Sequence, residues 1–102
     1  MCKFDIMKKY LVVIEKADSN YSAFSPDIPG CITVGDTIEE TLTNMKEAIE
    51  LSLEYDLDKG NNIPVPKGLQ FHINAGIFNE KEIGENYFIT QVEIESSELL
   101  HA

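Results

Sequence analysis

Cysteine, histidine and carboxylate side chains are the groups that could carry chemistry in this chain, so their spacing is the first question. A nucleophilic thiol needs a neighbouring base. The chain offers only His72 and His101 beside its two cysteines, Cys2 and Cys31. These four positions are too scattered for a zinc site. We therefore expect no metal or cofactor, and we predict that Cys31 is a reduced, buried thiol at the start of a strand.

The carboxylates do not have the arrangement that metal-dependent phosphodiester cleavage requires. That chemistry needs several carboxylates that converge on two ions about 4 Å apart. The first apolar run has an acid only at its end, Glu15, whereas Asp18, Asp27 and Asp36 lie in predicted turns or at a helix start. We therefore predict that the protein is not an enzyme and has no catalytic residues.

The turn at residues 26–31 has the sequence PDIPGC. Pro26 and Pro29 restrict its backbone, and Gly30 lets the chain reverse into the next strand. Two interpretations of Asp27 stay open. Its carboxylate accepts hydrogen bonds from amides of the turn, or it presents a charge to a binding partner.

The charge balance limits the partners. The 102 residues carry 18 acids and eight bases, a formal net charge of -10, and every base is a lysine. Proteins that read nucleic acids rely on arginine, and an acidic chain is repelled by phosphates, so direct nucleic-acid binding is disfavoured. An acidic domain is either simply soluble or is steered toward a basic partner. Since no apolar run could span a bilayer and the first residues lack the apolar core of a secretion signal, we expect a cytoplasmic protein.

The first third of the chain predicts three strands. Residues 8–16 form an apolar run in which alternate side chains on both faces are hydrophobic, which is typical of an inner strand. The turn residues 18–20 and a second strand at Tyr21–Ser25 follow, where Tyr21 is either a core residue or a contact residue. A third short strand covers Cys31–Val34, and Gly35 ends it.

A strong helix start follows at residues 35–40. Asp36 or Thr37 can cap the helix, and Glu39 or Glu40 can answer as a capping box. Apolar residues then recur at helical spacing to about Tyr55 or Leu57 and predict a stripe on the core, made of Ile38, Leu42, Met45, Ile49 and Leu53. The opposite side carries an acidic ridge with one leucine beside it, made of Glu39, Glu40, Glu47, Glu50, Leu51 and Glu54. This ridge is either a solvated face of the helix or a partner-binding surface.

Two further strands are predicted after the helix. The segment 63–66 is an extended IPVP tether, since proline fixes its own backbone and that of its predecessor. Alternating apolar residues then predict a short strand at Leu69–Ile73 and a final strand at Asn86–Glu95. If the helix is a right-handed crossover, the final strand lies parallel to the first. The fold class is α+β: a small mixed sheet with one main helix on one face.

Four motifs occur in order along this pattern: Tyr21, the PDIPGC turn, the GDTIEE helix start at 35–40, and Asn44 followed by Glu47-Ala48-Ile49. A segment with Gly60, Ile63, Pro64 and Pro66 comes next. In this order and spacing, over a little more than half the chain, they resemble the HicB family of antitoxins from bacterial type II toxin-antitoxin systems.

The resemblance implies one HicB-like domain over residues 1–102, with a core at 8–66, a C-terminal strand region at 67–95 and a partial RNase H-like fold. It implies an antitoxin that binds a basic HicA-like toxin, which degrades mRNA, and covers its RNA-binding and catalytic surface. We also expect a homo-oligomer, a dimer or a tetramer, that forms through exposed sheet edges or the C-terminal strand. Many members carry a DNA-binding domain, but residues 67–102 hold six acids and two lysines, which disfavours DNA binding by this chain. The alternatives are an orphan protein-binding module and a metal-dependent nuclease of RNase H type.

Overall fold

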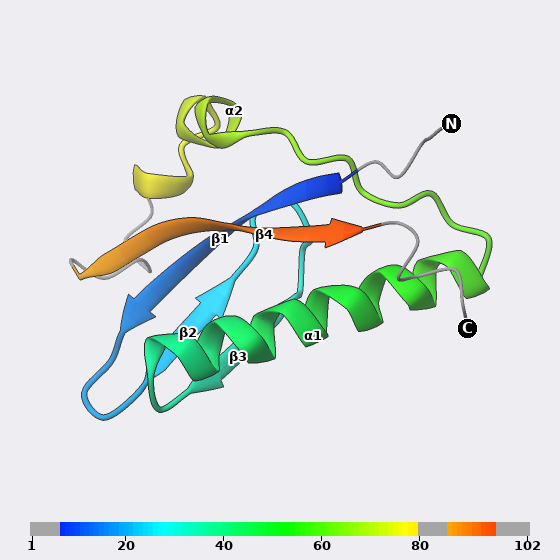
Figure 1. Ribbon diagram of the computed structural model, residues 1–102. Helices are drawn as coiled ribbons and strands as arrows, with labels where there is room; N and C mark the ends of the chain where they lie inside the picture. The colour runs from blue at the N-terminus through cyan, green and yellow to red at the C-terminus, as the bar shows by residue number, and fades with distance from the viewer. Residues whose placement is uncertain (1–6, 80–85, 96–102) are drawn as a thin grey trace.

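In the part of the chain that the structure describes, a four-stranded sheet carries one long helix across one face (Figure 1). The computed structural model describes residues 7–79 and 86–95. The strands stand in the order β3-β2-β1-β4, and the main elements are β1 (Met7–Lys16), β2 (Tyr21–Phe24), β3 (Ile32–Gly35), α1 (Ile38–Asp58) and β4 (Tyr87–Glu95). The α+β class and the main helix on one face are confirmed.

β1 is buried on both faces, as predicted. Tyr10, Val12 and Ile14 belong to the core cluster between the sheet and α1, and each is at most 1% exposed. Leu11 and Val13 point to the opposite face and are also buried. Full burial of a large apolar side chain contributes about 1.5–3 kcal/mol to the free energy of folding. Since β1 buries side chains on both of its faces, it is the centre of the fold.

α1 packs its predicted apolar stripe on this core. Met45, Ile49 and Leu53 are fully buried, and Ile38 and Leu42 are partly buried against them. The opposite side of the helix is polar, so its amphipathic period explains both its length and its position. No helix in residues 7–79 and 86–95 is long and apolar enough to cross a membrane.

Thr37 caps the start of α1. Its hydroxyl oxygen accepts a hydrogen bond from the Glu40 N–H at 3.0 Å, and the Glu40 carboxylate accepts one from the Asp36 N–H at 2.8 Å. This is the reciprocal pattern of a capping box, shifted by one residue on the return bond. Of the two candidate caps, Thr37 is therefore the one used.

The predicted parallel pairing of the last strand is wrong, because β1 pairs antiparallel with β4, and the other strand pairs within residues 7–79 and 86–95 are also antiparallel. The sheet is therefore not mixed. α1 does not lead directly into β4. Figure 1 shows that the chain turns back after α1 and runs along the sheet to a second helix, α2 (Leu69–Asn74), before β4 begins. This return path reverses the direction in which β4 enters the sheet.

The segment predicted as a strand at Leu69–Ile73 is the helix α2. Gly68 precedes it at φ 89°, a left-handed conformation that favours glycine and turns the chain out of the extended tether. The alternation of apolar residues gave a wrong prediction here, because five residues are too few to distinguish a strand from one turn of a helix. His72 is the buried residue of α2, whereas Phe71 is 51% exposed.

Asp27 joins the turn, β1 and the return segment. One carboxylate oxygen accepts from the Leu11 N–H at 2.9 Å. The other accepts from the Lys67 N–H at 3.0 Å and lies 2.7 Å from His72 Nε2. Its side chain is 0% exposed. Burial by itself raises the pKa of Asp27, but the hydrogen bonds from Leu11, Lys67 and His72 outweigh it and hold the pKa below its usual value.

Tyr10 makes a second link to the return segment. Its hydroxyl donates to the Pro64 carbonyl oxygen at 2.7 Å. Burial, followed by the charges of Asp27 and Asp56, raises the pKa of Tyr10 to about 12, so the hydroxyl keeps its proton at neutral pH. The chain after α1 is thus fixed to β1 at two points.

Gly35→Ala is expected to destabilise the fold. A Cβ at Gly35 would lie 2.5 Å from Thr41 Oγ1 and 2.7 Å from the Thr41 backbone nitrogen, so β3 and α1 would have to separate. We expect a loss of about 1–3 kcal/mol in the free energy of unfolding, measured by urea denaturation. Val34→Ala, at an exposed site on the same strand, is the control, with a change of about 0.5 kcal/mol. Equal stabilities of the two variants would contradict this packing.

Asp27→Asn is expected to cost about 2–4 kcal/mol of unfolding free energy at neutral pH. The Asp27 carboxylate accepts backbone hydrogen bonds through both of its oxygens, from the N–H groups of Leu11 and Lys67. The asparagine amide has only one acceptor oxygen, so its NH₂ group would face one of these two donors. Asp18→Asn, at an exposed turn, is the matched control with a change of about 0.5 kcal/mol or less.

The pH dependence of this loss has a defined sign. Because the pKa of Asp27 is lower in the folded than in the unfolded protein, its stabilising effect is complete above the unfolded value and is lost as the pH falls through the folded value. The stability difference between wild type and Asp27→Asn should therefore shrink below about pH 4. A difference that stays constant from neutral to strongly acidic pH would exclude an ionised Asp27.

Candidate functional site

The PDIPGC turn is a structural element. Two backbone hydrogen bonds hold the turn. The Ile28 N–H donates to the Ser25 carbonyl oxygen, and the Cys31 N–H donates to the Ile28 carbonyl oxygen. Gly30 adopts φ 85°, as the reversal of the chain requires. Cys31 is 8% exposed, and burial raises the pKa of its thiol, which makes it a poor nucleophile. The prediction of a buried thiol is confirmed.

Asp27 does not lie at the surface with the other residues predicted to bind a partner. Its side chain is enclosed and its oxygens are taken by Leu11, Lys67 and His72. The structure supports internal hydrogen bonding for Asp27, but all three donors lie outside the turn, whereas the interpretation had named amides of the turn itself. The burial removes Asp27 as a direct partner contact. Within the described parts of the chain, no three His, Cys, Asp or Glu side chains gather closely enough to hold a metal ion.

The remaining residues predicted to bind a partner lie on the solvent side of α1. Glu39, Glu40 and Glu47 are exposed, and Glu50 and Glu54 are half-buried. Glu40 also serves the helix cap. These positions form the predicted ridge, but its members differ in how freely they can meet a partner.

Leu51 is 67% exposed and lines a groove between α1 and the PDIPGC turn. This Leu51 groove has a volume of about 400 Å³ and is formed by Pro29, Gly30, Cys31, Ile32, Ala48, Leu51 and Ser52. Ile32, on the edge strand β3, is also 67% exposed. Glu47 and Glu54 lie one helical turn before and after Leu51 along α1. Glu47 also lines a separate groove on the β4 side of the helix, with Gln91 and Val92. The Leu51 groove is therefore an apolar site next to the acidic side of α1.

Sequence reasoning identified Leu51 but missed Ile32 and Tyr55. Tyr55 follows Leu51 by one helical turn and is 60% exposed. Ile32 belongs to an alternating strand, and nothing in that alternation says which face the helix covers. A short edge strand could have been expected to leave one of its apolar faces open.

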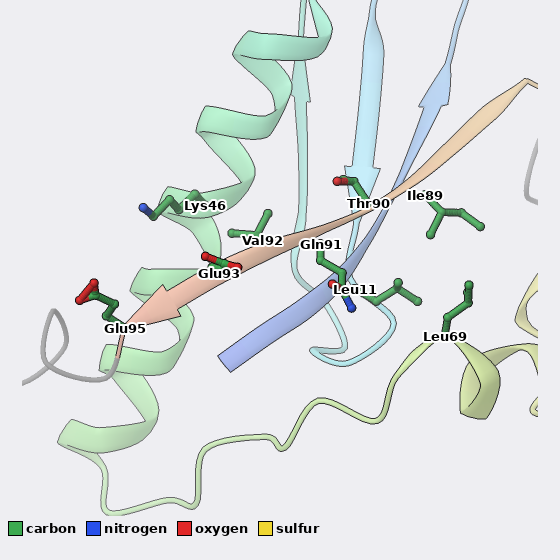
Figure 2. A pocket seen from close by; sticks show the side chains of 9 residues that line it. All are labelled: Leu11, Lys46, Leu69, Ile89, Thr90, Gln91, Val92, Glu93 and Glu95. Atoms are coloured by element: carbon green, nitrogen blue, oxygen red, sulfur yellow. The ribbon is translucent and has the colours of Figure 1, made fainter. Parts of the chain in front are cut away.

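A second groove runs along β4, at the opposite edge of the sheet. It has a volume of about 760 Å³, and Figure 2 shows Lys46 of α1 on one side of β4 and Leu69 of α2 on the other. The residues of β4 that line it are Ile89, Thr90, Gln91, Val92, Glu93 and Glu95. Unlike the Leu51 groove, this one follows the backbone of an edge strand.

Antitoxins are among the solved structures with this fold. The antitoxin HicB of Burkholderia pseudomallei superposes with a TM-score of 0.67 at 24% identity, over 84% of this chain and 62% of that one. A chain of the HicA3 and HicB3 toxin-antitoxin complex superposes with a TM-score of 0.65 at 26% identity, over 84% and 96%. The fold described above is therefore that of the HicB antitoxins.

Sequence comparison agrees with the fold. An uncharacterised 14.9 kDa protein of Haemophilus phage HP1 is 30% identical over 91 residues, which are 89% of this chain and 64% of that protein. The chain thus spans less than two thirds of the phage protein and of the Burkholderia antitoxin. Residues 10–100 match the family model described as HicB-like antitoxin of bacterial toxin-antitoxin system. The chain therefore belongs to the HicB-like antitoxin family.

Proposed function

We propose that this protein is an antitoxin that binds a basic HicA-like toxin and covers the surface with which the toxin holds and cleaves mRNA. Membership of the family supports an antitoxin role, and a relative of similar fold occurs in a complex of HicA3 with HicB3. The protein acts by binding, without catalysis, in the cytoplasm where mRNA is translated. It does not bind DNA through residues 67–102, and it forms homo-oligomers.

The observation that carries this proposal is the Leu51 groove. A protein that holds RNA presents lysine and arginine side chains, so its partner should offer carboxylates around an apolar anchor. Leu51 and Ile32 supply the apolar anchor, and Glu47 and Glu54 lie one helical turn from Leu51 along α1. Apolar residues at the centre of an interface dominate its affinity, whereas charges at the rim set the association rate and the choice of partner.

The net charge of -10 acts over a longer range. It attracts a basic toxin before contact and speeds association at low salt. The toxin complex should therefore weaken as the ionic strength rises. The same charge repels RNA, so the antitoxin does not compete by holding the substrate itself.

The test is co-expression with the small basic reading frame next to this gene. Wild-type protein should restore the growth of cells that express that toxin, and the double variant Glu47→Lys/Glu54→Lys should fail. The control is Asp18→Lys/Asp58→Lys, at exposed positions away from the groove. Both double variants change the net charge by the same amount, so they differ in place alone.

Measured directly, the dissociation constant for the toxin should rise about tenfold or more in Glu47→Lys/Glu54→Lys and far less in the control. Equal losses in the two variants would show that only net charge matters and that the Leu51 groove is not the contact. No complex between the wild-type protein and a neighbouring basic protein would overturn the antitoxin function itself.

A further inference from the structure

β4 is the longer edge of the sheet, and its outward hydrogen-bonding groups can be identified. The Leu11 N–H donates to Asp27, on the side of β1 away from β4, whereas the Lys16 N–H donates to Asn86 on the β4 side. Backbone groups alternate along a strand, so Lys9, Leu11 and Val13 point away from β4. Their partners on β4 are Glu93, Gln91 and Ile89. The backbone N–H and C=O groups of these three residues therefore point away from β1, in the plane of the sheet, at its free edge.

Among the described residues, β4 has a strand neighbour on one side only. β3, the other edge, has four residues, and its Val34 carbonyl accepts a bond from the Asn44 side chain. β4 has nine residues beside an open groove, and its side chains Tyr87 and Ile89 are 38% and 40% exposed. A long edge of this kind is a template for a further strand.

The order of the outward-pointing residues of β4 favours a second copy of the same strand. From the start of β4 they are Tyr87 and Ile89, then Gln91, then Glu93 and Glu95. If two copies pair antiparallel about Gln91, Ile89 meets Glu93 and Tyr87 meets Glu95. No acid then faces an acid. Lys9 Nζ lies 3.7 Å from Glu93 Oε2 of the same chain. Its positive charge further reduces the repulsion between the acids of the two copies.

We infer that two copies of this chain associate by antiparallel pairing of their β4 strands, centred on Gln91, into one continuous sheet. The two-fold axis is then perpendicular to the sheet, so both α1 helices lie on the same side of it. The Leu51 grooves lie at the opposite edge, beside β3, and stay open at the two ends of the dimer. The inference specifies the proposed self-association and leaves one toxin site on each copy.

The two associations should respond to salt in opposite directions. Each copy carries a net charge of -10, so the copies repel one another, and screening by salt should strengthen the dimer. A complex with a basic toxin should weaken under the same change. Sedimentation of the full chain at several protein and salt concentrations measures the dimer, and titration with the toxin is measured separately.

Ile89 is the position that tests the pairing. Ile89→Glu places an acid opposite Glu93 of the second copy and should raise the dimer dissociation constant about tenfold or more. Ile89→Lys should leave the dimer intact or tighten it, since lysine then faces that glutamate. The control is Leu51→Glu, which adds the same charge at the other edge and should weaken toxin binding while leaving the dimer unchanged. Circular dichroism verifies that each variant is folded.

Covalent trapping tests the centre of the pairing. In a Cys2→Ser background, Gln91→Cys should form a disulfide with its own copy, because paired Cα atoms in an antiparallel ladder lie about 5.5 Å apart. Glu95→Cys should not, since its own copy is several residues away. A monomeric chain at high salt and high protein concentration, or equal effects of Ile89→Glu and Ile89→Lys, would overturn the inference. Toxin binding could survive either result.

Discussion

The fold depends on the hydrogen bonds of one buried carboxylate, that of Asp27. It stands beside β1 just where β2 has ended at Phe24, so it accepts the Leu11 N–H in place of a strand carbonyl. Its other oxygen holds Lys67 and His72, which are 40 and 45 residues further along the chain. A buried carboxylate without donors would cost several kcal/mol, so the turn, β1 and the return segment stabilise one another at this point.

The direction of β4 follows from that attachment. The bonds from Lys67 to Asp27 and from Tyr10 to Pro64 hold the return segment against the sheet. α2 therefore lies at the end of the sheet from which β4 must start, and β4 runs antiparallel to β1. Its register then decides which residues point outward. Had β4 followed α1 directly, a parallel strand would have offered a different edge.

Local patterns were sufficient to predict β1, α1 and a helix cap at Asp36 or Thr37, because burial on two faces, a helical stripe and a capping box are each encoded within a few neighbouring residues. The path after α1 was not predictable in this way. His72 and Asp27 are far apart in sequence, and neither residue type indicates its partner. α2 was misread because its apolar residues alternate over a single turn. The acidic side of α1 was predictable from its period, but the Leu51 groove needs the PDIPGC turn to pack beside it.

The strongly acidic charge connects the two proposed associations. Two copies, each at -10, oppose their own pairing, whereas a basic toxin bound at either Leu51 groove lowers the charge of that copy. Repulsion across β4 would then decrease although the two surfaces lie at opposite edges of the sheet. Because linkage is reciprocal, the dimer would also hold toxin more tightly than the monomer does. Long-range electrostatics alone would supply this coupling, with no change in the fold, and screening by salt would remove it.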